Sequence, residues 1–175
     1  MIFTDTPIDG AYLVDLEPRA DDRGSFARAF CQREFEAKGI RFNIVQCNLA
    51  RTLHAGVVRG LHFQEAPADE QKLVRCVAGA VFDALVDMRA RSPTYRSIFW
   101  VRLDAKERRS LLIPSGVAHG YQALEDGTEF LYMTDQFYAP SVERGVRYSD
   151  PMLAIPWPLP ARDVADRDRQ WELLT

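Results

Sequence analysis

The chain has 175 residues, of which 47% are hydrophobic, a size that suits one domain with a substantial core and is too short for two ordinary domains. We therefore expect residues 1–175 to form a single domain. The 22 basic and 25 acidic residues give a net charge of -3 and are mixed along the chain, which excludes a basic surface of the kind that neutralises a nucleic-acid backbone.

The N-terminal residues, Met1–Asp5, hold no basic segment followed by an apolar run. No part of the chain approaches the roughly 18 consecutive apolar residues of a membrane-spanning helix. The sequence therefore predicts a soluble, cytoplasmic protein that binds neither membrane nor nucleic acid. Its cysteines, Cys31, Cys47 and Cys76, lack the paired spacing of a zinc site or a redox motif, and we interpret them as small buried hydrophobic residues.

Short runs rich in Val, Ile, Phe and Tyr recur along the chain, with turn residues between them at intervals typical of β-sandwiches and small barrels. In chain order the predicted strands are Ala11–Leu16, Phe42–Ala50, Val57–Gln64, Lys72–Val77, Val81–Met88, Ser97–Leu103, Ser110–Pro114, Val117–Ala123, Glu129–Thr134 and Val146–Tyr148. Only Arg33–Lys38 and the C-terminal stretch Asp166–Leu173 are predicted to be helical or irregular. We therefore expect an all-β fold, with the jelly roll among the candidate architectures.

Two of the three histidines, His62 and His119, fall within predicted strands, where an unpaired imidazole is costly. Each must be hydrogen-bonded, bound to a metal, or held ready to move a proton. Lys72 follows His62 by ten residues across the polar loop from Glu65 to Glu70, which is long enough for the two strands to pair as an antiparallel hairpin. A neutral base and a buried ammonium would then face one space, as removal of a proton next to a carbonyl requires.

Because side chains alternate along a strand, the sequence also predicts which residues share a face. One face mixes polar residues with small or aromatic ones, which indicates a binding site in one wall of the barrel interior. The sets on this face are Gly60, His62 and Gln64; Lys72, Val74 and Cys76; Val117, His119 and Tyr121; and Phe130, Tyr132 and Thr134. In the opposite orientation of the strands, the residues that point inward would be Leu61, Phe63, Leu73, Leu131 and Met133. In a two-layer fold both faces can be buried.

The predicted barrel lacks the residue pattern of a metal site. Metal-binding barrels of this kind usually supply His-x-His, a nearby carboxylate and a further histidine in a later strand. Here Gln64 stands two residues after His62, and His54 falls in a predicted loop. Neither G-x-G-x-x-G nor G-x-x-x-x-G-K-[ST] occurs, so we expect no metal and no nicotinamide cofactor, and chemistry carried out by side chains alone.

Several short motifs form a distinctive set at their observed spacings. They are Arg59–Gln64 (RGLHFQ), Lys72–Val74 (KLV), Asp87–Arg89 with Ser92–Thr94, Ile113–Gly120 (IPSGVAHG), and Asp150–Pro151 with Trp157–Pro158. This combination, from about Asp15 to Asp168, resembles the dTDP-4-dehydrorhamnose 3,5-epimerase family. The resemblance implies a cupin-like jelly-roll β-barrel with short peripheral helices, no metal or other cofactor, and a homodimer whose subunits exchange a strand near the N-terminus.

The resemblance also implies a reaction, the inversion of C3 and C5 of a nucleotide-linked 4-keto-6-deoxyhexose on the way to L-rhamnose. His62 matches the general base that removes the proton on the carbon next to the C4 ketone. Lys72 matches the lysine that holds the enolate oxygen. Tyr132 matches the acid that returns a proton from the opposite face of the ring, a second donor that inversion requires, and a tyrosine stays neutral at pH 7.

The base is expected to have a carboxylate partner near the C-terminus. The family uses an aspartate within a Ser-x-Lys-Asp pattern, and the corresponding residue here is Asp168. A carboxylate hydrogen-bonded to Nδ1 of His62 would fix the tautomer and favour the imidazolium once the proton arrives. Asp163 and Asp166 lie close enough in sequence to be alternatives.

Further positions match residues that bind the substrate, a nucleotide-diphosphate sugar. They are Arg23, Gln46, Asn48, Arg59, His119 and Glu143, and Tyr138 is expected to line the sugar site. Arginine suits a diphosphate because its guanidinium donates two parallel hydrogen bonds. His119 has an alternative role, which is to satisfy backbone groups in the turn after Pro114.

Two candidate substrate-binding residues differ from the family pattern. Members specific for dTDP usually carry a glutamate five residues after the arginine of the D-x-R-G motif, and Arg28 reverses that charge. A cation there could pair with phosphate or with a neighbouring carboxylate. Arg167 replaces the lysine of the Ser-x-Lys-Asp pattern. The reaction class is therefore better supported than the nucleotide, and thymidine, cytidine and guanosine all stay open.

Three alternative functions also stay open. The enzyme could invert only C3 or only C5, it could be a 3,4-ketoisomerase on the same scaffold, or it could bind a nucleotide sugar without reacting it. A base, an oxyanion holder and an opposite-face acid in one chain favour catalysis.

Overall fold

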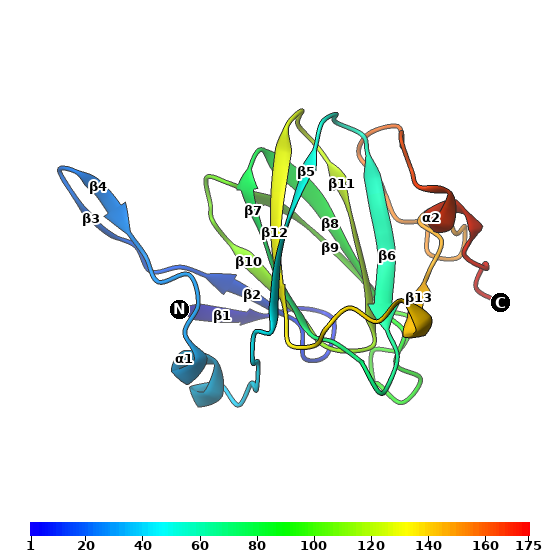
Figure 1. Cartoon of the computed structure of the whole chain (residues 1–175), viewed down its shortest axis with the longest axis horizontal. Helices are drawn as coiled ribbons and strands as arrows, with labels where there is room; N and C mark the ends of the chain where they lie inside the picture. The colour runs from blue at the N-terminus through cyan, green and yellow to red at the C-terminus, as the bar shows by residue number, and fades with distance from the viewer.

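Two antiparallel β-sheets packed face to face form the body of the molecule in a computed structural model that describes residues 1–175 (Figure 1). In the six-stranded sheet the order is β1 (Ile2–Asp5), β2 (Tyr12–Asp15), β10 (Ser110–Ile113), β7 (Lys72–Ala78), β12 (Thr128–Thr134) and β5 (Gln46–Thr52). In the five-stranded sheet it is β13 (Glu143–Gly145), β6 (Val58–Gln64), β11 (Val117–Ala123), β8 (Ala80–Asp87) and β9 (Ile98–Asp104). The predicted all-β jelly-roll class is confirmed.

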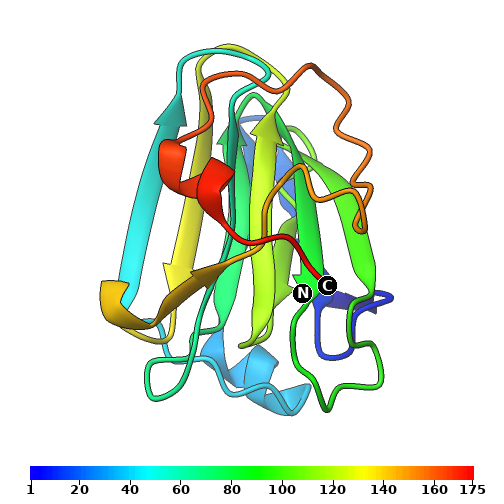
Figure 2. The same cartoon turned by 90° about the vertical axis from the view of Figure 1, so that its right-hand side faces the viewer.

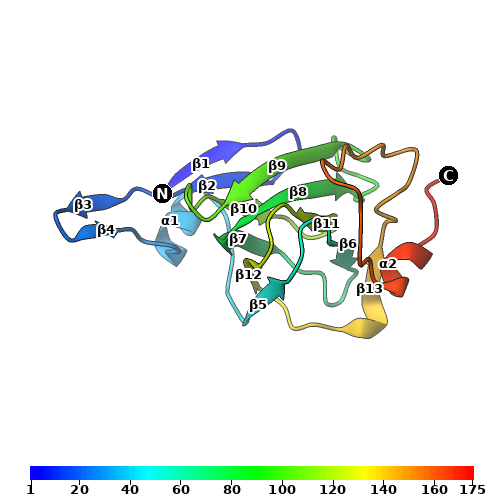
Figure 3. The same cartoon turned by 90° about the horizontal axis from the view of Figure 1, so that it is seen from above.

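The remaining elements lie outside the two sheets. Strands β3 (Arg19–Asp21) and β4 (Gly24–Phe26) form a hairpin that projects from the body (Figure 1, Figure 3). The helices are α1 (Gln32–Ala37), the 3-10 turn η1 (Pro140–Val142) and α2 (Asp166–Gln170). Both helical stretches predicted from sequence are thus helical in part. None of the helices is long and apolar enough to cross a membrane.

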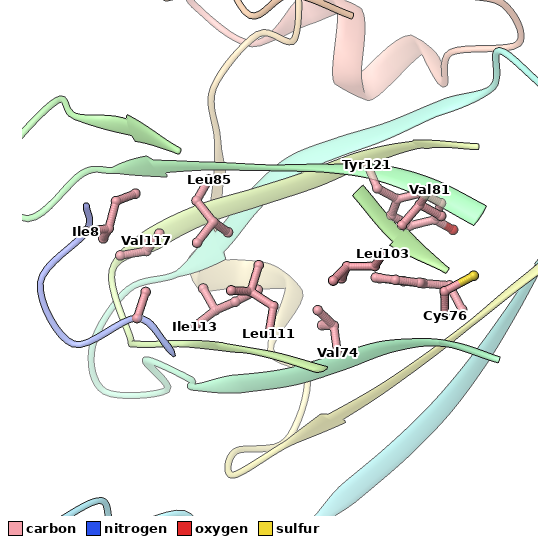
Figure 4. Close-up of a cluster of buried hydrophobic side chains, with 12 residues drawn as sticks. Ile8, Val74, Cys76, Val81, Leu85, Leu103, Leu111, Ile113, Val117 and Tyr121 are labelled. Atoms are coloured by element: carbon pink, nitrogen blue, oxygen red, sulfur yellow. The ribbon is translucent and has the colours of Figure 1, made fainter. Parts of the chain in front are cut away.

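The main hydrophobic core lies between the two sheets (Figure 4). Leu111 and Ile113 of β10 pack there with Leu85 of β8 and Leu103 of β9, and all four side chains are fully or almost fully buried. Completely burying one such side chain contributes about 1.5–3 kcal/mol to folding. This core fills one end of the space between the sheets and leaves the other end to polar residues.

Each sheet also buries part of its outer face. Leu61 of β6 packs under Leu153 of the C-terminal segment, which Figure 2 shows lying across the face turned to the viewer. On the other sheet, Leu73 of β7 and Met133 of β12 pack against Phe35 of α1. Residues on both alternating faces of the central strands are therefore buried, as the sequence allowed for a two-layer fold, whereas Leu49 of β5 and Trp100 of β9 are exposed.

The predicted hairpin between the strands of His62 and Lys72 is wrong. Strand β6 pairs with β11 and β13, whereas β7 pairs with β10 and β12, so the two strands belong to opposite sheets. The loop between them crosses from one sheet to the other. His62 and Lys72 nevertheless face one space, because both line the cavity between the sheets, and the ammonium Nζ of Lys72 donates to the backbone carbonyl oxygen of His62 at 3.4 Å.

Other local expectations also need correction. The last predicted strand, Val146–Tyr148, is wrong, because the observed strand β13 covers Glu143–Gly145 and ends one residue before the predicted start. Strands β1, β3 and β4 were not predicted, because they are short and mostly exposed and therefore lack an apolar face. Of the cysteines, only Cys76 is buried, and Cys47 is exposed.

Close contact between β6 and β11 requires glycine two residues before His62. The backbone of Gly60 has φ +111°, and a Cβ there would lie 2.5 Å from Cα of Gly120. Any other residue would push the strands apart and adopt a strained backbone. The glycine of the RGLHFQ motif thus helps to set the position of the histidine that follows it.

Asp87 organises the turn that follows β8. Its buried carboxylate accepts hydrogen bonds from Arg89 at 2.9 Å, Ser92 at 2.6 Å and Thr94 at 2.7 Å. Burial opposes ionisation of this carboxyl, but these donors outweigh it and hold the pKa of Asp87 well below its ordinary value. The Asp-x-Arg and Ser-Pro-Thr motifs are therefore two halves of one buried polar network.

This depressed pKa predicts a pH-dependent contribution to stability. The contribution of Asp87 is fully present above the unfolded-state pKa of about 3.9 and is lost as the pH falls toward the folded-state value. We expect Asp87→Asn to lower the free energy of unfolding by about 3 kcal/mol at neutral pH. Urea titrations at neutral and acidic pH should show this difference shrinking in acid. Exposed Asp5→Asn is the control, and an equal loss at both pH values would contradict the network.

Candidate active site

A cavity of about 730 Å³ lies at the polar end of the space between the two sheets. This volume is in the range of small-molecule binding sites. The predicted site residues that line it are Gln46, Asn48, Arg59, His62, Lys72, His119, Tyr132, Tyr138, Glu143, Arg167 and Asp168. They come from both sheets, from the segment before β13 and from α2, so the fold brings together residues that are far apart in sequence.

Two predicted residues, Arg23 and Arg28, do not line this cavity. Arg23 lies at the tip of the projecting hairpin, where its guanidinium pairs with Asp21 at 2.6 Å. Arg28 pairs with Glu34 at 3.0 Å on the surface. Of the two partners that the sequence left open for Arg28, a phosphate or a neighbouring carboxylate, the structure shows a carboxylate. Within one chain, neither arginine is brought to the other site residues.

His62 forms a short hydrogen bond with Asp168. Nε2 of the imidazole lies 2.6 Å from Oδ1 of the buried carboxylate, and the other oxygen, Oδ2, accepts from the backbone N–H of Gly60 at 3.0 Å. Burial opposes ionisation of Asp168, but the bonds from His62 and Gly60 and the charge of Arg167 hold its pKa below the ordinary value. Asp168 is therefore an ionised acceptor.

The contact differs from the expected one in its ring atom. The carboxylate bonds Nε2 of His62 instead of Nδ1, so the neutral imidazole carries its proton on Nε2. Nδ1 lies 3.9 Å from Oε1 of Glu143 and is the atom left to act as a base. The alternative partners are excluded, because Asp163 pairs with Arg162 and the side chain of Asp166 is 87% exposed.

Lys72 has a carboxylate partner that the sequence did not suggest. Its Nζ lies 3.0 Å from Oε1 of Glu70, and both side chains are largely buried. From the sequence, Glu70 was assigned to a polar loop and was not expected to enter the site. The spacing from Glu70 to Lys72 was the available signal, since residues two apart at the start of a strand point the same way.

His119 pairs with a second buried carboxylate. Its Nε2 lies 2.9 Å from Oδ2 of the fully buried Asp83, while Oδ1 of Asp83 has no hydrogen-bond partner. Burial raises the pKa of Asp83, and the interaction with His119 and the charge of Lys72 act in the opposite direction. The structure records this bond to Asp83 and no side-chain bond from His119 to the backbone of the turn after Pro114. An aspartate inside the otherwise apolar run of β8 was the missed signal.

Tyr132 lies on the wall opposite His62. It belongs to β12 of the six-stranded sheet, whereas His62 belongs to β6 of the five-stranded sheet, and both side chains line the cavity. Burial raises the pKa of Tyr132, with Arg59 lowering it and Glu70 raising it further, so the phenol is neutral at pH 7. A ligand between the sheets would have an imidazole on one side and a phenol on the other.

Tyr138, Glu143 and Arg167 form a polar cluster beside His62. Oε2 of Glu143 accepts from Nη1 of Arg167 at 2.6 Å and from the hydroxyl of Tyr138 at 3.1 Å. Arg167, which replaces the lysine of the Ser-x-Lys-Asp pattern, thus donates a hydrogen bond to the Glu143 carboxylate in the cavity wall. The cluster also ties α2 to β13.

Gln64 holds the neighbouring loops and does not line the cavity as the alternation predicted. Its amide nitrogen donates to the carbonyl oxygens of Ala68 and Phe137, and its amide oxygen accepts from the backbone of Ala139. No group of three or more His, Cys, Asp or Glu side chains is arranged so as to hold a metal ion.

Comparisons with known proteins agree on one family. A family model described as dTDP-4-dehydrorhamnose 3,5-epimerase matches residues 5–175. The chain is 46% identical over 159 residues to dTDP-4-dehydrorhamnose 3,5-epimerase from Pseudomonas aeruginosa, covering 89% of this chain and 87% of that protein. It is 40% identical over 168 residues to dTDP-4-dehydrorhamnose 3-epimerase from Streptomyces niveus, covering 95% of this chain and 81% of that protein.

A solved structure gives the same result. The crystal structure of dTDP-4-dehydrorhamnose 3,5-epimerase from Bacillus anthracis, with TDP and PPi bound, matches with a TM-score of 0.95 at 36% sequence identity. The match covers 99% of both chains. The similarity therefore extends over the cavity as well as the sheets.

The geometry of His62 makes a prediction that needs no substrate. We expect ¹⁵N NMR of the histidine side chains to show the neutral His62 imidazole as the Nε2–H tautomer, because ionised Asp168 accepts that proton. Asp168→Asn should weaken this preference, and Asp166→Asn is the matched control. An Nδ1–H tautomer in the wild-type protein would contradict the arrangement.

Proposed function

Because the chain belongs to the dTDP-4-dehydrorhamnose 3,5-epimerase family, we propose that it inverts C3, C5 or both of a nucleotide-linked 4-keto-6-deoxyhexose. The observation that carries the proposal is the position of His62 and Tyr132 on opposite walls of one cavity. A sugar ring held between them meets a base on one face and an acid on the other. Inversion requires this arrangement, since a single base returns the proton to the face it left.

In the first step, the lone pair of Nδ1 of His62 takes the proton from the carbon next to the C4 ketone. The electrons of the broken C–H bond form the C–C double bond of an enolate, and the negative charge moves to the ketone oxygen. The ammonium of Lys72 donates to that oxygen. A fixed donor of this kind stabilises an oxyanion by about 3–4 kcal/mol in a site that excludes water.

In the second step, Tyr132 donates its phenolic proton to the same carbon from the opposite face. The enolate electrons form the new C–H bond and the ketone is restored. The phenolate then regains a proton from solvent and the imidazolium releases one, so the enzyme returns to its starting state with no net gain or loss. The raised pKa of Tyr132 supports this role, because the acid must be protonated at neutral pH.

The positive side chains of the cavity are proposed to hold the diphosphate of the substrate. Arg59 lines the wall with Gln46 and Asn48, and these groups supply charge and hydrogen-bond donors. We further propose that residues 1–175 act as one domain and that the enzyme works in the cytoplasm. The nucleotide itself is left to substrate tests with dTDP-, CDP- and GDP-linked sugars.

We also propose a homodimer in which the N-terminal β3–β4 hairpin reaches the cavity of the partner subunit. The hairpin projects from the body, carries Arg23 at its tip, and exposes 76% of Phe26 (Figure 3). A large apolar side chain on an extended arm is typical of a contact surface. In this arrangement Arg23 and Arg28 would approach the substrate of the other subunit.

Replacing Tyr132 by Phe tests the chemistry, because it removes one hydroxyl and keeps the ring. With dTDP-4-keto-6-deoxyglucose in D2O, we expect the Tyr132→Phe variant to incorporate deuterium with retained configuration faster than it forms epimer. Wild type should give labelled epimer, and His62→Asn should lose exchange about 10²–10⁴-fold. Exposed Tyr95→Phe is the matched control.

The same experiment separates the alternatives. Label at C3 alone, at C5 alone or at both identifies which centres react, and a product without the C4 ketone would identify a ketoisomerase. No exchange by wild type with any of the three nucleotide sugars would leave only binding. Equal loss of exchange and inversion in Tyr132→Phe would show that Tyr132 is not the opposite-face acid.

Mixed dimers test the hairpin exchange. We expect Arg23→Ala and His62→Asn to be impaired as separate homodimers. When the two variants are co-expressed, the mixed dimer should regain activity, because one cavity then combines His62 of its own chain with Arg23 of the partner subunit. If each cavity used only its own Arg23, no mixed dimer could be active, and activity would not exceed that of the separate variants.

A further inference from the structure

Gly145 makes an unusually close contact with a tryptophan at the C-terminus. Gly145 lies on β13, directly opposite His62 in the register of β6 and β13. A Cβ at this position would lie 2.1 Å from Cε2 and 2.2 Å from Nε1 of Trp171. The indole therefore occupies the space that any other side chain would need. The backbone of Gly145 is not in the left-handed region, so the absence of a side chain is what this contact requires.

Trp171 also contacts the site from the other direction. Its ring lies edge-on to the imidazole of His62, with centroids 6.2 Å apart. Its carbonyl oxygen accepts from Nε of Arg147 at 2.7 Å, and its indole Nε1 is buried without a hydrogen-bond partner. Since Trp171 immediately follows α2, the same residue touches the strand beside His62 and ends the helix that carries Asp168.

Helix α2 depends on such contacts for its position. It has only five residues, and an isolated helix of that length is not stable in water. Asp168 must nevertheless stay buried and within 2.6 Å of Nε2 of His62. Arg167 in the first turn of the helix bonds Glu143, and the backbone of Leu174 beyond its end bonds Asp150. The indole fills the space between the helix and β13.

We propose that Trp171, packed on Gly145, is a positioning residue that holds the Asp168 carboxylate against His62. The proposal rests on the proposed function, in which His62 is the base that Asp168 orients. Trp171 neither gives nor takes a proton, and although its ring also lies edge-on to the His62 imidazole, its proposed effect on catalysis passes through the position of Asp168. The pairing also explains why β13 carries glycine at the position opposite His62.

Gly145→Ala is the direct test, because the new Cβ must displace the indole. A displacement of about 1 Å at a reacting group can lower the rate by about 10²-fold. We expect Gly145→Ala and Trp171→Ala each to lower kcat for deuterium exchange by about that factor, with KM changed much less because neither residue binds substrate. Trp100→Ala, which removes a half-exposed indole elsewhere, should leave both constants unchanged.

Double variants test whether the two residues act together. Once the indole is gone, the added methyl has nothing to displace, so Gly145→Ala/Trp171→Ala should be no slower than Trp171→Ala. For the same reason, Asp168→Asn should cost much less in the Trp171→Ala background than in wild type. Full additivity in both pairs would overturn the proposal.

A readout independent of catalysis separates this proposal from the proposed function. The backbone N–H of Gly60 donates to Oδ2 of Asp168, so withdrawal of the carboxylate should speed hydrogen exchange at Gly60, as measured by NMR. Faster exchange at Gly60 in Gly145→Ala and Trp171→Ala supports the proposal even if wild type proves inactive as an epimerase. If the Gly60 amide in both variants exchanges as slowly as in wild type, the proposal is overturned. This holds also if the two variants lower the melting temperature and change nothing else.

Discussion

The bond between Nε2 of His62 and Oδ1 of Asp168 joins residues 106 positions apart, and the geometry of the site depends on it. This bond requires the Asp168 carboxylate to be buried away from water. Burial is unfavourable for a carboxylate unless hydrogen-bond donors of the protein replace the lost water molecules. The imidazole and the backbone of Gly60 are those donors. The C-terminal segment must therefore be docked before His62 has a fixed tautomer with Nδ1 available as the base.

The two-sheet architecture gives the second constraint. Because β6 and β12 belong to opposite sheets, His62 and Tyr132 approach the cavity from opposite sides without any loop having to carry them there. Two ionisable groups of the cavity are each held by a carboxyl group: Lys72 by Glu70, and His119 by Asp83. Pairing keeps these groups buried at tolerable cost, and it leaves the Lys72 ammonium close to the base. The same packed sheets that stabilise the chain thus orient its reactive groups.

Much of this could be predicted from the sequence. Alternation in single strands predicted that His62, Lys72, His119 and Tyr132 share one interior, and the motifs predicted the family. Sequence reasoning failed where the answer depends on pairing between distant strands. A loop of the right length suggested a hairpin between β6 and β7, although the chain crosses between sheets there. Glu70 was missed because its burial depends on its pairing with Lys72. The contact between Gly145 and Trp171 was missed because nothing in the local sequence relates those two residues.

In the proposed mechanism, a base and an acid act on opposite faces of one sugar ring. A crystal structure with a bound nucleotide-linked 4-keto-6-deoxyhexose measures this directly. We expect Nδ1 of His62 to lie on one face of the reacting carbon and the hydroxyl of Tyr132 on the other, with the ketone oxygen at Nζ of Lys72. A ring that places both groups on the same face, or a ketone oxygen directed away from Lys72, would contradict it.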